Sequence, residues 1–172
     1  MKILGVIPAR YNSSRFPGKP LANIGGKSMI ERVYTQARKC DLLSELYVAT
    51  DDDRIFSHVK SFGGEVLMTG EHSSGTARCN ALYKNLKNEF DVIINIQGDE
   101  PFINPEQISQ LADCFLEKDI AIATLAKQIK TDEQLLDENT VKVMFDKNNF
   151  ALNFSRLAIP QPKSFDVKKW FV

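Results

Sequence analysis

The residues best suited to chemistry lie in a loop near the N-terminus, PARYNSSRFPGKP, which spans residues 8–20. Its three cations are Arg10, Arg15 and Lys19, and its prolines and glycine prevent a helix that would hold these cations apart. An irregular loop can curl so that guanidinium groups, an ammonium group and backbone N–H groups converge on one anion. A triphosphate is the ligand that fits this loop best, and a solvated basic loop is the alternative.

A second loop, Gln97-Gly98-Asp99, directly follows the apolar run DVIINI at residues 91–96. Gly98 has no side chain and lets a ligand approach the backbone closely. The Asp99 carboxylate could hold a Mg²⁺ ion that neutralises bound phosphates, although it could equally cap a turn or the next helix. Ligands of open parallel sheets bind at the carboxyl ends of the strands, so we expect the two loops to share one site.

Other kinds of site find little material in this sequence. Its two histidines and three widely spaced cysteines match no metal-ligand spacing and offer little for a Ser–His–Asp triad. Gly26-Lys27-Ser28 resembles the end of a Walker A motif, but Leu21 occupies the position of its first glycine. A Rossmann GxGxxG motif is also absent from the sequence.

The charge distribution indicates one anionic ligand, and the net charge of zero argues against a general nucleic-acid binder. The 22 basic residues balance 22 acidic ones over the chain, yet residues 1–40 carry eight basic residues and one acid. No window approaches the roughly 18–20 apolar residues of a membrane span, and the N-terminus lacks the features of a signal peptide. We expect a cytoplasmic protein without membrane or nucleic-acid partners.

Alternating strand and helix patterns must position the two loops. This alternation predicts an α/β fold with a mostly parallel central sheet and helices on both faces. Residues 8–27 are expected to be irregular, and Ser28 with Glu31 forms a capping box that opens a helix. The expected strands are 2–7, 45–49, 65–68, 91–96 and 121–126, and the other expected helices are 52–62, 76–88 and 105–117.

The C-terminal part is richer in β-strand patterns. TVKVMFD and FALNFSR are two such runs, and Lys147-Asn148-Asn149 between them suggests a hairpin. We predict a single domain over residues 1–172. Because the sequence finishes on Trp170-Phe171-Val172, we expect it to be the N-terminal portion of something longer.

Five segments together resemble the 3-deoxy-D-manno-octulosonate (Kdo) cytidylyltransferases: IPARYNSSRFPGKPL, YVATDDDRI, HSSGTAR, NIQGDEPFI and ALNFSRLAIP. The resemblance implies a Rossmann-like nucleotidyltransferase fold and the transfer of CMP from CTP to Kdo, with release of pyrophosphate and a requirement for Mg²⁺. It further implies a role in lipopolysaccharide biosynthesis and a homodimer for the full-length family member. An acid commonly stands in this family where the present sequence has Ala77.

The resemblance also implies site residues. Those for the nucleotide are Pro8, Ala9, Arg10, Ser14, Arg15, Lys19, Ser74, Gly75, Thr76 and Arg78. Gln97 and Gly98 would contact the sugar, and Arg156 its carboxylate, which the Arg fork matches. Asp99 would bind the metal and, with Arg10, Arg15 and Lys19, act in catalysis.

Two other functions remain open at this point. The first is another sugar nucleotidyltransferase, such as a CMP-sialate synthetase. The second is an inactive CTP-binding fragment, because the family continues beyond residue 172 with further sugar-binding residues and a second metal-ligating aspartate.

Overall fold

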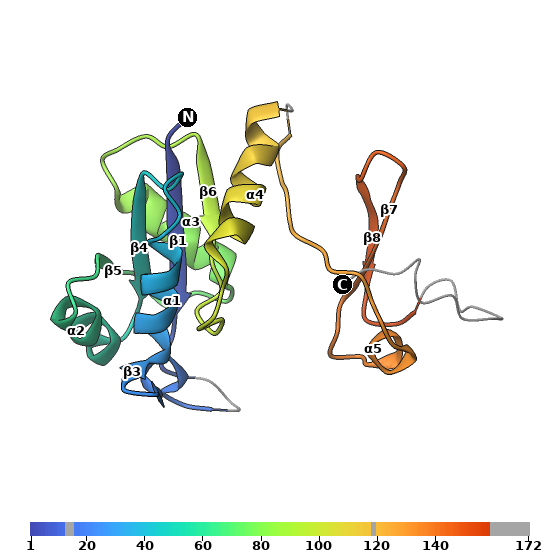
Figure 1. Ribbon diagram of the computed structural model, residues 1–172. Coiled ribbons are helices and arrows are strands. Elements are labelled where there is room, and N and C mark those ends of the chain that lie inside the picture. Colours follow the sequence, from blue (N-terminus) through green and yellow to red (C-terminus); the bar gives the residue numbers. More distant parts are fainter. Residues whose placement is uncertain (13–15, 118–119, 159–172) are drawn as a thin grey trace. The chain divides into compact units, whose positions relative to one another are not determined.

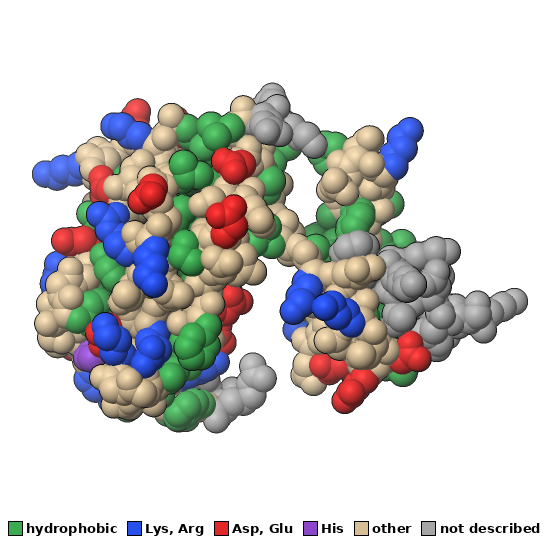
Figure 2. Space-filling model, in the orientation of Figure 1, with side chains coloured by type: hydrophobic (Ala, Val, Ile, Leu, Met, Phe, Trp, Pro, Cys, Tyr) green, Lys and Arg blue, Asp and Glu red, His purple; other side chains and the backbone are tan. Residues whose placement is uncertain are grey.

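The computed structural model describes residues 1–12, 16–117 and 120–158, and the chain divides into two compact units, residues 1–123 and 124–172 (Figure 1). The single domain expected over residues 1–172 stays a prediction. Basic and acidic side chains are mixed over the first unit on the face shown in Figure 2. None of the helices in the described ranges is long and apolar enough to cross a membrane.

The first unit is built on a parallel sheet of four strands, in the order β5-β4-β1-β6. These strands are β1 (Ile3–Ala9), β4 (Glu45–Thr50), β5 (Val66–Met68) and β6 (Val92–Asn95). The chain adds β4 and β5 on one side of β1 and then returns to place β6 on its other side (Figure 1). The order of strands therefore reverses next to β1, which is where an open α/β sheet binds ligands.

Helices cover both faces of this sheet, as the sequence predicts. They are α1 (Met29–Ala37), α2 (Asp53–Ser61), α3 (Gly75–Asn85) and α4 (Pro105–Glu117). Apolar residues of α1, α2 and α4 share one core with Ile3 and Ile7 of β1. Leu4 and Val6, which point to the opposite face because successive strand residues alternate, pack with Cys79 and Leu82 of α3.

The segment between β1 and α1 is more regular than expected. It contains a short 3₁₀ helix, η1 (Lys19–Leu21), and the antiparallel strands β2 (Asn23–Ile24) and β3 (Lys27–Ser28). The prediction of irregular structure through residue 27 was therefore wrong, because Gly25-Gly26 with φ of +57° and +87° forms a two-residue hairpin turn. The predicted capping box is confirmed, since the Ser28 hydroxyl accepts a hydrogen bond from the Glu31 N–H at 3.1 Å.

The second unit contains α5 (Asp132–Leu136) and an antiparallel pair, β7 (Lys142–Phe145) and β8 (Ala151–Ser155). The two β-rich runs thus form the expected hairpin. The strand predicted at 121–126 does not form, which corrects that expectation. Its apolar side chains find no pairing edge, and Ile122 remains 88% exposed. The apolar end at residues 170–172 lies outside the described residues.

Candidate active site

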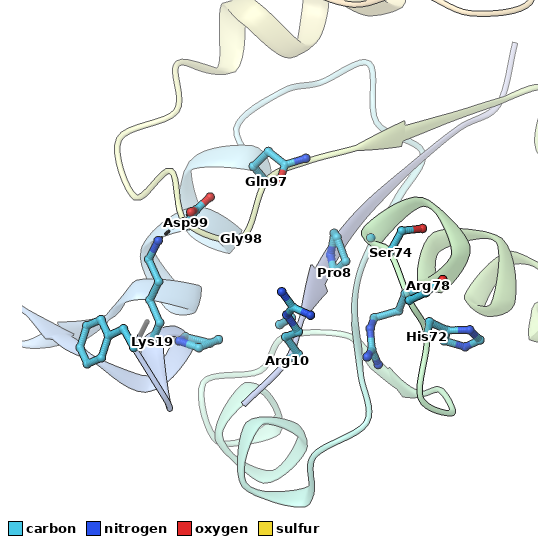
Figure 3. Close-up of a pocket in the computed structure, with 14 residues that line it drawn as sticks. Pro8, Arg10, Lys19, His72, Ser74, Arg78, Gln97, Gly98 and Asp99 are labelled. Carbon is cyan, nitrogen blue, oxygen red and sulfur yellow. Dashed lines mark hydrogen bonds and ion pairs between the residues drawn. The ribbon is translucent and has the colours of Figure 1, made fainter. Parts of the chain in front are cut away.

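A pocket of about 590 Å³ opens at the carboxyl ends of β1 and β6 (Figure 3). Its volume lies within the usual range for small-molecule sites. Three short segments and four separate side chains line it, namely residues 8–10, 72–75 and 97–99 with Phe16, Lys19, Pro20 and Arg78. Residues from the two loops that the sequence predicts to share a site therefore line one pocket.

Two glycines allow the loops of the pocket to lie against the end of β1. A Cβ atom at Gly98 would lie 2.9 Å from the Pro8 carbonyl oxygen, a distance that real Cβ atoms essentially never show. A Cβ atom at Gly75 would lie 3.3 Å from the Pro8 ring. Pro8 is thus enclosed between the loop after β6 and the start of α3, and side chains at either glycine would push these walls apart.

A cation and a carboxylate meet across the pocket. The Lys19 Nζ lies 2.6 Å from Asp99 Oδ2, and both side chains remain partly exposed, at 36% and 51% (Figure 3). The pair joins η1 to the loop after β6. It neutralises two of the charges that the sequence assigns to ligand binding, so an entering anion or cation has to compete with the partner already present.

Arg10 lines the pocket and is available to a ligand. It follows β1 directly, its side chain is exposed, and within the described part of the chain it makes no hydrogen bond or ion pair. In Figure 3 it lies between Lys19 and Arg78. Ser14 and Arg15, which the resemblance adds to this group, lie outside the described residues.

Arg78 lines the same pocket but is 3% exposed and already has partners. Its Nη2 donates to Asp51 Oδ2 at 2.5 Å, and its Nη1 donates to the Thr69 hydroxyl at 2.8 Å. These contacts tie α3 to the loops after β4 and β5. The guanidinium group thus holds the segment of residues 70–75 in place. This role is separate from the nucleotide contact that the resemblance implies for Arg78.

The start of α3 provides the wall opposite Lys19. Ser74 caps the helix, its hydroxyl accepting from the Ala77 N–H at 3.1 Å. Ser74 and Gly75 line the pocket, whereas Thr76 is exposed and is not part of its lining. The positive end of the helix dipole therefore faces the same space as the cations. The nucleotide contacts implied for these three residues stay predictions.

The pocket includes residues that the sequence reasoning missed, namely Phe16, Pro20, His72 and Ser73. His72 is the most informative of them, because its buried Nε2 has no hydrogen-bond partner among the described residues. A buried polar atom without a partner is costly, and a ligand in the pocket could satisfy it. In the sequence, the signal that could have identified His72 as a pocket residue was its position two residues before the Ser74 cap.

The residues present fit a magnesium ion that arrives with a nucleotide. The described residues contain no cluster of three or more His, Cys, Asp or Glu side chains able to hold a metal. Among the residues that the structure describes in the pocket lining, Asp99 is the one carboxylate, half exposed and turned toward the cationic loop. Mg²⁺ is commonly bound by one or two carboxylates together with substrate phosphates, so a single aspartate suits this mode of binding.

Arg156 belongs to the second unit. It follows β8, and its Nη1 donates to the carbonyl oxygens of Glu138 and Asn139 at 3.0 and 3.3 Å. The buried Lys142 ammonium donates to the backbone oxygens of Asp137 and Arg156. The backbone at Arg156 is therefore held firmly within its own unit.

Comparison with known proteins identifies the relatives of this chain. A family model described as cytidylyltransferase matches residues 4–169. A 3-deoxy-manno-octulosonate cytidylyltransferase of Parabacteroides distasonis is 50% identical over 99% of the chain and 69% of that relative. An 8-amino-3,8-dideoxy-manno-octulosonate cytidylyltransferase of Shewanella pealeana is also 50% identical, over 93% of the chain and 67% of that relative.

A solved structure is similar over nearly the whole chain. It is a CMP:2-keto-3-deoxy-manno-octonic acid synthetase complexed with CTP, and it superimposes with a TM-score of 0.93 at 40% identity. The match covers 99% of the present chain and 70% of the solved one.

Proposed function

The chain belongs to the cytidylyltransferase family, and on this premise we propose that it transfers CMP from CTP to the anomeric hydroxyl of Kdo. The hydroxyl oxygen forms a bond to the α-phosphorus. At the same time the bond breaks between this phosphorus and the oxygen that bridges it to the β-phosphate. The hydroxyl proton is lost and pyrophosphate leaves. Positioning and charge neutralisation are the main requirements of such a reaction.

The observation that carries this proposal is the composition of the pocket wall. Arg10 and Lys19 bring two cations to the end of β1, and Asp99 brings one carboxylate to the end of the adjacent β6. This arrangement suits a polyphosphate with a divalent cation. The solved relative bound to CTP supports the choice of nucleotide.

Each group then has a distinct task. We assign Arg10 and Lys19 to the phosphates, where they orient the nucleotide and stabilise the charge that builds up on pyrophosphate. Asp99 would hold Mg²⁺ together with phosphate oxygens, and the ion would supply charge neutralisation there. The wall formed by Ser74, Gly75 and His72 would receive the cytidine part, and Gln97 and Gly98 would border the sugar.

The test is calorimetric binding of CTP to this chain with Mg²⁺, followed by pyrophosphate release in the presence of Kdo. CTP should bind more tightly than UTP, GTP or ATP, and Kdo should support more release than sialic acid. The 8-amino-3,8-dideoxy analogue forms a third arm, because a relative of each name is 50% identical to this chain. Equal binding of all four nucleotides would contradict the proposal.

A further inference from the structure

We propose that Tyr11 and Arg54 are positioning residues that hold Arg10 and Lys19 at the pocket. Neither Tyr11 nor Arg54 lines the pocket. The inference rests on the proposed function, in which Arg10 and Lys19 bind the phosphates of CTP. It arises from a chain of contacts that runs from the start of α2 to the loop between β1 and η1.

The central contact is a stacked cation and ring. The guanidinium carbon of Arg54 lies 3.3 Å from the centre of the Tyr11 ring. Arginine is suited to such stacking because its guanidinium group is planar and weakly hydrated. The contact joins a residue of α2 to the residue that directly follows Arg10.

Arg54 is fixed in direction by Asp52. Its Nε and Nη2 donate to the two oxygens of that carboxylate, at 2.9 and 2.6 Å. Asp52 in turn accepts from the backbone N–H of Arg54 at 3.0 Å, as the N-cap of α2. The Arg54 guanidinium holds the pKa of the Asp52 carboxyl below its usual value, so the carboxylate that orients the arginine stays charged at neutral pH. The plane of the guanidinium is therefore set by the helix.

The Tyr11 ring also contacts Gly18, the residue before Lys19. A Cβ atom at Gly18 would lie 3.1 Å from two carbons of that ring, and the glycine has a φ of +72°. The Gly18 N–H donates to the Tyr11 carbonyl oxygen at 2.8 Å. Tyr11 and Gly18 thus form a neck that brings the two ends of the loop together.

This neck explains how two cations nine residues apart come to line one pocket. Arg10 precedes Tyr11, and Lys19 follows Gly18, so each cation lies one residue outside the neck. Lys19 then reaches Asp99. A shift of the Tyr11 ring would change the separation of the two cations, and with it their fit to a run of phosphates.

If Arg54 only stabilised the fold, its removal would lower the unfolding temperature. The positioning role predicts a different outcome. The Arg54 side chain is 57% exposed, and exposed ion pairs contribute little to stability. Removing it should therefore barely change the unfolding temperature. Its loss should instead weaken ligands whose phosphates extend to Lys19, and spare ligands that end at the α-phosphate.

The test compares CTP and CMP binding in Tyr11→Leu and Arg54→Met. Each variant should bind CTP about fivefold more weakly, the scale of one cation–π contact, with CMP affinity changed less than about twofold. The double variant should lose no more CTP affinity than the single variant that binds CTP more weakly, since both changes break the same contact. Tyr11→Phe keeps the ring, and Lys60→Met removes another exposed, acid-paired cation of α2, so both should match the unchanged protein.

A second measurement separates this inference from the proposed function. Hydrogen exchange of the Gly18 N–H should be faster in Arg54→Met if the contact holds the neck. Equal losses for CTP and CMP, or unchanged CTP binding and exchange, would overturn the inference. If the unchanged protein bound no CTP, the proposed function would fail, and the Gly18 exchange would still decide whether Arg54 holds the neck.

Discussion

Two arginines line the pocket from different elements of the fold, and they are in opposite states. Arg78, in the wall formed by α3, is buried and donates to Asp51 and Thr69. Arg10, at the end of β1, is exposed and has no partner within the described part of the chain. The family resemblance implies nucleotide contact for both.

This difference shows that a charged residue in a binding motif can do either of two jobs. A charge that is compensated by the protein fixes the shape of the site, since breaking a buried pair is costly. An uncompensated charge is available to a ligand of opposite sign. Lys19 and Asp99 lie between these cases, because they compensate each other only until a ligand separates them.

The largest effect is expected for Asp99→Asn, which keeps the shape of the side chain and removes its charge. Pyrophosphate release should fall at least about a hundredfold, on the scale of losing one preorganised charge-stabilising group. Binding of Mn²⁺ as a probe for Mg²⁺, followed by electron paramagnetic resonance, should weaken as well. The exposed neighbour Glu100, changed to Gln, is the matched control. Near-normal metal-dependent release by Asp99→Asn would remove Asp99 from the site.

Arg78→Met should cost stability, whereas Arg10→Met should not. The first change leaves Asp51 and Thr69 without their donor in a mostly buried environment, which should lower the free energy of unfolding by about 2–3 kcal/mol. The second should change that free energy by less than about 0.5 kcal/mol and weaken CTP binding instead. Urea unfolding and calorimetry on the same two variants give both quantities. Equal destabilisation by the two changes would erase the distinction between the two arginines.

Lys19→Met should move two affinities in opposite directions. CTP binding should weaken by about 1.5–3 kcal/mol, the scale of a charge-assisted hydrogen bond, with a smaller loss for CMP. Mn²⁺ binding without nucleotide should become tighter, because the ammonium 2.6 Å from Asp99 Oδ2 competes with the metal for that carboxylate. Lys27→Met removes a cation paired with Glu31, outside the pocket lining, and should alter neither. A weaker Mn²⁺ affinity in Lys19→Met would contradict the competition.

Much of the fold could be predicted from sequence, and so could the position of the pocket. The buried strand patterns at β1 and β6, and the loops that follow them, locate the pocket because parallel strands bring their carboxyl ends to one edge. Ser28 and Glu31 mark the start of α1 because a capping box is local in sequence. The Thr131–Gln134 spacing gives the same signal for α5, where the Thr131 hydroxyl accepts from the Gln134 N–H, and it was overlooked.

The sequence could not show which charged side chains neutralise each other when they lie far apart along the chain. Asp51 lies 27 residues before Arg78, and nothing local shows that this carboxylate neutralises that guanidinium. The segment at 121–126 failed as a strand for a related reason, since its apolar residues favour strand structure only where a partner edge is available. Pairing depends on which elements meet, and local patterns do not contain that information.

The smallest effect concerns the rate at which the thiols are modified. It tests whether the buried residues of α3, such as Arg78, stay inaccessible to solvent. Cys79 is buried beside Arg78, and this burial raises the pKa of its thiol to about 11. A raised pKa keeps the thiol protonated, so at pH 8 only about one molecule in a thousand carries the reactive thiolate. Cys114 is exposed and should react with iodoacetamide at that pH, while Cys79 should remain unmodified by mass spectrometry.

Raising the pH should increase the rate at Cys79 about tenfold per unit up to about pH 11, provided that the protein stays folded. Unfolding in urea should expose all three cysteines and supplies the control for complete reaction. Arg78→Met should speed the modification of Cys79 at pH 8, because it releases α3 from Asp51 and Thr69. If Cys79 reacted as fast as Cys114 in the unchanged protein, this wall would open in solution, and the contrast between the two arginines would not hold.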